Sequence, residues 1–236
     1  MKNYSTPIAI VIAGIIIAGA VIYTGSNPSN SLIAEDEQYD YEKLDEVTKA
    51  DHIQGNLGAL ITIVEYSDLE CPFCKRFHET LNLLLKDYSK DELAWVFRQA
   101  PLDSLHRQAR TEAIASECVA KLAGEEAFWN YIDKIYTSTT SNDGLDLNLL
   151  PQFAVEVGTD KQKFETCLNL KETEKLVQAD FDNVLSSSNS VPQIFGTPFV
   201  IIYTKDGQRI PLPGAVPYEQ LKPALDQLLT EIEQNN

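Results

Sequence analysis

Residues 59–88 read ALITIVEYSDLECPFCKRFHETLNLLLKDY, and two hydrophobic patterns meet within this stretch. Apolar and polar residues alternate over 59–66, which predicts a β-strand, and apolar residues recur at helical spacing over 73–88. Residues 92–98 predict a second strand. A strand, a helix and a strand in this order form a βαβ unit. The two cysteines of this stretch therefore lie where the first strand passes into the helix.

The spacing of these two cysteines favours redox chemistry. Cys71 is expected at the N-cap of the helix, where unpaired N–H groups and the positive end of the helix dipole stabilise a thiolate. Pro72 falls in the first helical turn, where a helix tolerates proline best. Cys74 lies one turn further on, and we expect Phe73 and Phe77 to shield it. Cys74 is therefore the expected resolving thiol.

A C-x2-C pair is also half of a zinc site, which is the alternative interpretation. A complete site needs two more ligands at similar spacing, but Cys118 and Cys167 stand alone in helix-like segments. The three histidines of the sequence form no second pair either. We therefore favour a redox pair, and the sequence indicates neither a metal nor a cofactor.

The N-terminal region predicts export from the cytoplasm. Residues 8–23 read IAIVIAGIIIAGAVIY and carry no charge. At about 1.5 Å per residue they span about 24 Å, short of the roughly 30 Å hydrocarbon core, yet they are long for a signal-peptide core. We expect residues 1–23 to be an uncleaved transmembrane signal-anchor, which places the catalytic domain outside the cell membrane. Cleavage near Ala18-Gly19-Ala20, giving a secreted or periplasmic protein, is the alternative.

The rest of the chain divides into a linker and one domain. Residues 24–50 are polar and rich in acids, which predicts a flexible linker. Residues 51–236 are enough for one packed domain, with an all-helical insertion at about 103–190. Its apolar residues recur at helical spacing over 105–122 and 147–157, among other stretches, which predicts helices there. A hairpin signal at 205–207 and a last helix at 218–232 follow. The formal net charge of −16 argues against nucleic acid as a partner.

All four cysteines of an exported chain can be oxidised, because no cytosolic thiol pool keeps them reduced. We expect one pair between Cys71 and Cys74 and a structural disulfide between Cys118 and Cys167. The alternative for the second pair is two separate buried thiols that act as small apolar side chains.

The order βαβ, helical insertion, ββα is that of an α/β thioredoxin-like fold with a helical insertion. The chain resembles the DsbA-like family of extracytoplasmic thiol-disulfide oxidoreductases, in its membrane-anchored bacterial branch. The resemblance implies that Cys71 and Cys74 introduce or exchange disulfide bonds in unfolded exported proteins, and that a membrane quinone-linked thiol oxidase reoxidises them. The matching stretches are 51–55, 63–68, 70–74, 97–98, 101–102, 164–168, 196–198 and 214–215.

The resemblance also assigns three residues near the cysteines. Thr197 and Pro198 match a loop that faces the cysteine pair, with a cis peptide bond before the proline that presents the backbone to an extended substrate. Glu65 matches a buried acid that accepts a proton from Cys74. The residues alone place Glu65 on the strand face of Ile61 and Ile63, so an exposed strand-face carboxylate is the alternative.

Two departures from the resemblance concern the direction of electron flow. Strongly oxidising members of the family often have a histidine where this chain has Phe73, and Thr197 before the proline resembles isomerase-like members. A disulfide isomerase or reductase of the same fold is therefore one alternative function. A non-catalytic thioredoxin-fold binding module is the other.

Overall fold

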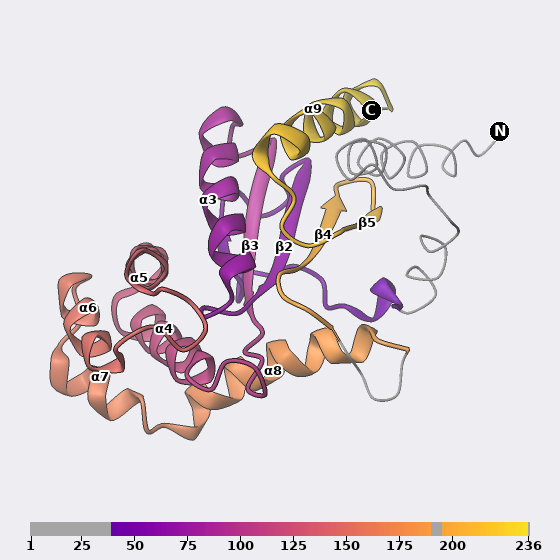
Figure 1. Cartoon of the computed structure of the whole chain (residues 1–236). Helices are drawn as coiled ribbons and strands as arrows, with labels where there is room; N and C mark the ends of the chain where they lie inside the picture. Colours follow the sequence, from indigo (N-terminus) through magenta and orange to yellow (C-terminus); the bar gives the residue numbers. More distant parts are fainter. Residues whose placement is uncertain (1–38, 190–194, 236) are drawn as a thin grey trace.

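The computed structural model describes residues 39–189 and 195–235, which build a mixed five-stranded sheet with helices on both faces (Figure 1). The strands lie in the order β1-β3-β2-β4-β5. Of the neighbouring strand pairs in the described residues, β2–β3 is parallel and the others are antiparallel. A parallel pair needs a crossover, which is supplied here by a helix. The strands are β1 (His52–Gln54), β2 (Ile61–Ser67), β3 (Leu93–Gln99), β4 (Phe199–Thr204) and β5 (Arg209–Leu212).

The crossover helix is α3 (Pro72–Asp87), and α9 (Tyr218–Asn235) lies beside it (Figure 1). Between β3 and β4 the chain forms a helical block that extends past one end of the sheet. Its longest helix, α8, contacts both β2 and β3. The block consists of α4 (Ala109–Ala123), α5 (Glu125–Ser138), η2 (Leu147–Leu149), α6 (Leu150–Glu156), α7 (Lys161–Cys167) and α8 (Lys171–Ser187).

Alternate residues of β2 enter two separate hydrophobic cores. Ile61 and Ile63 pack with α3, α9 and the helical block, whereas Val64 and Tyr66 pack in a smaller core with Val184 of α8. All of β2 is buried, because helices cover both faces of the central strands. The α/β thioredoxin-like arrangement expected from the sequence is confirmed.

The observed elements differ from the prediction in three places. Strand β1 was not predicted, because three residues are too few to show an alternating pattern. The helix expected to begin near residue 105 begins at Ala109, since turn hydrogen bonds join Leu105 and His106 to Leu102. The helix expected at 147–157 is divided into η2 and α6, and proline stands in the first turn of α6.

The expected signal-anchor at 1–23 lies outside the described residues. Among the helices within 39–189 and 195–235, none is long and apolar enough to cross a membrane.

The expected flexible linker at 24–50 is described only from residue 39 onward, and this part packs on the domain. It contains η1 (Tyr41–Lys43), and the side chain of Leu44 is 2% exposed in the smaller core. Arg209 of β5 donates hydrogen bonds to the carbonyl oxygens of Tyr41 and Leu44. Residues 39–44 of the expected linker therefore pack on the domain, whereas most of residues 45–50 are exposed. The apolar side chains of Tyr41, Leu44 and Val47 pack against the smaller core, and Arg209 of β5 and Arg98 of β3 bind carbonyl oxygens of this acidic segment.

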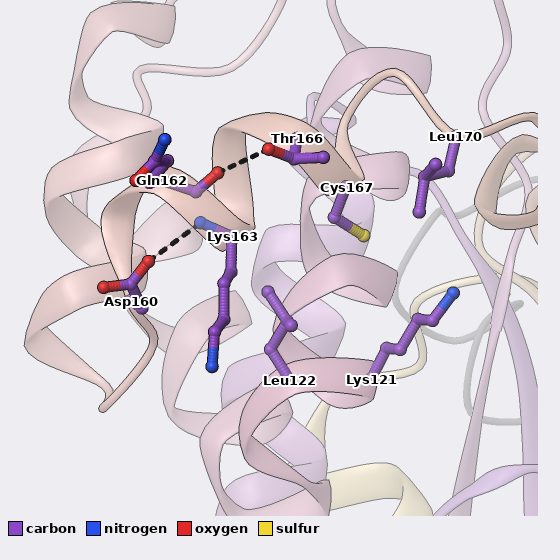
Figure 2. A pocket seen from close by; sticks show the side chains of 8 residues that line it. All are labelled: Lys121, Leu122, Asp160, Gln162, Lys163, Thr166, Cys167 and Leu170. Atoms are coloured by element: carbon purple, nitrogen blue, oxygen red, sulfur yellow. Dashed lines mark hydrogen bonds between the residues drawn. The ribbon is translucent and has the colours of Figure 1, made fainter.

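A disulfide joins Cys118 of α4 to Cys167 of α7, with a Cα–Cα distance of 5.8 Å. Both cysteines are buried, and the hydroxyl of Thr173 lies 3.5 Å from the Cys167 sulfur. Figure 2 shows Cys167 on the wall of a surface pocket, with Lys121 and Leu122 of α4 opposite. The disulfide thus ties two helices of the helical block together.

Candidate active site

The cysteine pair begins helix α3. Cys71 is the N-cap residue, with extended backbone angles, and Pro72 is the first helical residue. Both Cys71 and Cys74 are free thiols, and their side chains are buried. The sulfur of Cys71 lies 3.3 Å from the carbonyl oxygen of Thr197, and the Thr197–Pro198 peptide bond is cis. Folding therefore brings the loop before β4 against the start of α3, although more than 120 residues separate them.

The pKa values of the two thiols are shifted in opposite directions. A hydrogen bond with Cys74 is the main cause that lowers the pKa of Cys71 to about 6, and Thr197 and the N–H groups of Phe73 and Cys74 add to it, against the effect of burial. Burial raises the pKa of Cys74 well above its ordinary value, and the Cys71 thiolate raises it further. At neutral pH, Cys71 is therefore the thiolate and Cys74 keeps its proton.

Phe73 does not shield Cys74, so this expectation is wrong. Its ring is 53% exposed, and the guanidinium of Arg76 lies over it at 4.6 Å. Cys74, Phe77 and the residues that follow them at intervals of about one helical turn form the buried face of α3. Phe73 does not lie on this face, so its ring is exposed to solvent. Phe77 is fully buried, as expected.

Glu65 is fully buried on β2, so it is not an exposed strand-face carboxylate. Its carboxylate accepts hydrogen bonds from the Ser67 hydroxyl at 2.7 Å and the Trp95 indole N–H at 3.0 Å. Burial raises the pKa of Glu65 to about 8 despite these donors. Its charge interacts with both Cys71 and Cys74. Glu65 can therefore exchange a proton near neutral pH beside the cysteine pair.

A buried Asp68–His106 pair also borders the cysteines, and the sequence did not predict it. Asp68 follows β2, and its carboxylate accepts hydrogen bonds from the N–H groups of Leu102 and Glu70 and from Nδ1 of His106 at 2.7, 2.8 and 2.9 Å. Its own N–H donates to the sulfur of Cys74 at 3.4 Å. The pair therefore links the cysteines to the loop between β3 and α4.

Glu70, directly before Cys71, was also missed. It is fully buried and accepts hydrogen bonds from the Thr139 hydroxyl and from the N–H groups of Gly144 and Leu145. Burial and then the neighbouring Glu70 raise the pKa of Glu112 to about 10, so Glu112 is protonated at neutral pH. Glu70 thus anchors the cysteine loop to the helical block.

Two buried thiols of opposite acidity at a helix N-terminus, in a thioredoxin-like fold, define a protein thiol-disulfide oxidoreductase. The family model described as Thioredoxin matches residues 47–227. The chain belongs to this family, and it is a DsbA-like member of it.

Solved structures of DsbA proteins share this fold. Pseudomonas aeruginosa DsbA2 superimposes with a TM-score of 0.62 and 29% identity, over 78% of this chain and 97% of that one. Wolbachia pipientis alpha-DsbA1 gives 0.66 and 20% identity over 80% and 96% of the two chains. For BdbD from Bacillus subtilis, in its oxidised form, the TM-score is 0.59 and the identity 22%, over 82% and 96%.

Among curated proteins, the chain is similar to parts of larger antiporters. It is 30% identical to Na(+)/H(+) antiporter NhaA 1 of Mycolicibacterium gilvum over 148 residues, which are 61% of this chain and 23% of that protein. Na(+)/H(+) antiporter NhaA 3 of Salinispora tropica is 31% identical over 146 residues, 61% and 21% of the two proteins. The chain therefore spans less than a quarter of the length of these relatives.

Proposed function

We propose that this protein introduces or exchanges disulfide bonds in exported proteins through the Cys71–Cys74 pair, outside the cytoplasm. The observation that carries this proposal is the opposite shift of the two thiol pKa values. A stable thiolate at Cys71 is a good leaving group and favours the reduced form of the pair. A disulfide that favours its own reduction is readily donated to a substrate.

The donation runs in two exchange steps. A substrate thiolate attacks the Cys71 sulfur of the Cys71–Cys74 disulfide, that bond breaks, and Cys74 leaves as a thiolate and takes up a proton. A second substrate thiolate then attacks the substrate sulfur of this mixed disulfide, and Cys71 leaves as a thiolate. Two electrons pass from the substrate dithiol to the cysteine pair, and the substrate gains one disulfide.

Reoxidation needs an electron acceptor, and we assign this role to a membrane quinone-linked thiol oxidase. The uncharged run at 8–23 supports residues 1–23 as an anchor that keeps the domain of 51–236 at the membrane surface. Thr197 and Pro198, next to Cys71, are the proposed site where the substrate backbone approaches.

Refolding of a disulfide-containing protein tests the proposal. The oxidised protein is mixed with reduced, unfolded ribonuclease A without glutathione, and we expect ribonuclease activity to return with about one substrate disulfide formed per Cys71–Cys74 disulfide consumed. Unscrambling of wrongly paired ribonuclease without net oxidation would instead identify an isomerase. Failure in both assays, with binding of unfolded protein retained, would identify a binding module.

Glu65→Gln is expected to slow the release of substrate from the mixed disulfide by at least about tenfold and its formation much less. This step is the reverse of donation, in which the reduced pair attacks a substrate disulfide and Cys74 then displaces the substrate from Cys71. Cys74 must lose its proton to do so, and Glu65 accepts protons only when it is ionised. Because its pKa is raised to about 8, the difference between wild type and variant should grow as the pH rises through 8. Rapid-quench alkylation of the mixed disulfide measures both steps. Equal slowing of the two steps would contradict this role.

A further inference from the structure

The cysteine motif itself supplies no positive charge to the catalytic thiolate. The two residues between the cysteines are Pro72 and Phe73, and neither can carry a charge. His106 comes from the loop between β3 and α4, 35 residues after Cys71 in the sequence. Its side chain is only 8% exposed, and Nδ1 lies 2.9 Å from a carboxylate oxygen of Asp68, which is fully buried.

Asp68 connects this histidine to both cysteines through its backbone. Its N–H donates to the Cys74 sulfur at 3.4 Å, and its carbonyl oxygen accepts the N–H of Cys71 at 3.1 Å. The side chain of the same residue holds His106. One buried residue therefore holds the imidazole and contacts both cysteines.

The charges around His106 favour its protonated form. Burial lowers its pKa, but the hydrogen bond and charge of Asp68 outweigh burial, and the Cys71 thiolate and Asp143 raise the pKa further. Asp143 also pairs with the exposed Arg107, with 3.3 Å between the charged atoms.

Three more acids lie in this environment. Glu65 interacts with both cysteines from β2. The N–H of Glu70 donates to the Asp68 carboxylate, and Glu112 interacts with both Glu70 and Asp68. Burial raises the pKa of Glu65 and Glu112 to about 8 and 10, so both are largely neutral at pH 7. The protonated form of His106 is thus favoured in a buried site whose charges include the Cys71 thiolate.

We propose that the Asp68–His106 pair positions a positive charge that stabilises the Cys71 thiolate, and so makes the cysteine pair more oxidising. His106 is not a proton donor or acceptor in the exchange steps, so it acts through charge alone. This inference rests on the proposed role of Cys71 as the attacking thiol.

The wild-type protein gives the first test, because the coupling must be reciprocal. If His106 stabilises the thiolate, then the thiolate raises the pKa of His106, and this effect disappears when Cys71 is in a disulfide. NMR titration of the histidine side chains should show a higher pKa for His106 in the reduced protein than in the oxidised one. His52, held by Glu117 and Glu125, is the internal control and should not change. Equal His106 values in both states would overturn the proposal.

His106→Gln gives the second test, with Arg107→Gln as the matched control. Loss of the buried charge should raise the pKa of Cys71 by about one unit, which slows its alkylation by iodoacetamide roughly fivefold at pH 6. The same loss should make the reduction potential about 20 mV more negative at pH 7, as a fivefold change in the equilibrium constant requires. Arg107→Gln removes an exposed charge from the same loop and should leave both values unchanged.

The two tests separate this proposal from the proposed function. Alkylation and NMR titration need no substrate, so they report on the thiolate even if the protein acts as an isomerase. A wild-type alkylation profile in His106→Gln would show that the histidine only holds the loop. If Cys71→Ala retained exchange activity, the attacking thiol itself would be misassigned.

Discussion

Cys74→Ala will accumulate a covalent complex with an unfolded substrate that contains a disulfide, whereas Cys71→Ala will form none. Cys71 is the thiolate at neutral pH and attacks the substrate disulfide, while Cys74 is fully buried and protonated. Without Cys74 no thiol displaces the substrate from Cys71, so the mixed disulfide persists. Without Cys71 we expect exchange to fall by at least about a thousandfold, since the nucleophile itself is lost.

Non-reducing electrophoresis and mass spectrometry of the two variants measure this difference. The trapped species should have the summed mass of enzyme and substrate. Dithiothreitol should reduce its disulfide bond and release the two proteins. The double variant Cys71→Ala/Cys74→Ala is the control for non-covalent association. A complex trapped by Cys71→Ala and not by Cys74→Ala would reverse the assigned roles.

Removal of the second disulfide, in Cys118→Ala/Cys167→Ala, is expected to destabilise the domain by roughly 2–4 kcal/mol without changing turnover. The bridge closes a loop with a sequence separation of 49 residues, and its loss restores that freedom to the unfolded chain. For a domain of this size, the melting temperature should fall by about 5–15 °C. The bridge joins α4 to α7, whereas Cys71 and Cys74 lie at the start of α3, so we expect the chemistry at Cys71 not to depend on it.

Urea unfolding of the wild type and the double variant measures this stability, with Cys71 and Cys74 held in the same redox state in both proteins. Turnover is compared at 25 °C, where both proteins are expected to be folded. An unchanged free energy of unfolding would show that the bridge adds no stability. Loss of turnover in a folded double variant would show that it takes part in the redox cycle.

The sequence predicted the parts of the fold that local patterns determine. The alternation before Cys71 and the helical spacing after it are short-range signals, and they correctly gave the βαβ unit. The resemblance directed attention to Thr197 and Pro198, which lie beside Cys71 in the structure. No pattern within a short stretch could have joined that loop to the cysteines.

The buried polar network could not be predicted, because it depends on tertiary packing. Asp68 and His106 are 38 residues apart, and each stands in a turn-like segment that normally indicates a solvent-exposed side chain. Glu70 is similar, since its partners Thr139, Gly144 and Leu145 come from a loop about 70 residues away. Charged residues at these positions are normally exposed to solvent. Only the packed structure shows that hydrogen-bond donors compensate for the burial of these side chains.

The reduction potential of the Cys71–Cys74 pair tests the central claim most directly, because it measures the free energy that the low pKa of Cys71 supplies. Equilibration with glutathione redox buffers at pH 7, followed by alkylation and mass spectrometry, gives the reduced fraction at each poise. The value should lie between about −180 and −130 mV, which is less oxidising than the about −120 mV of DsbA because Phe73 carries no charge. A value near the about −270 mV of thioredoxin would contradict the proposal and identify a reductase.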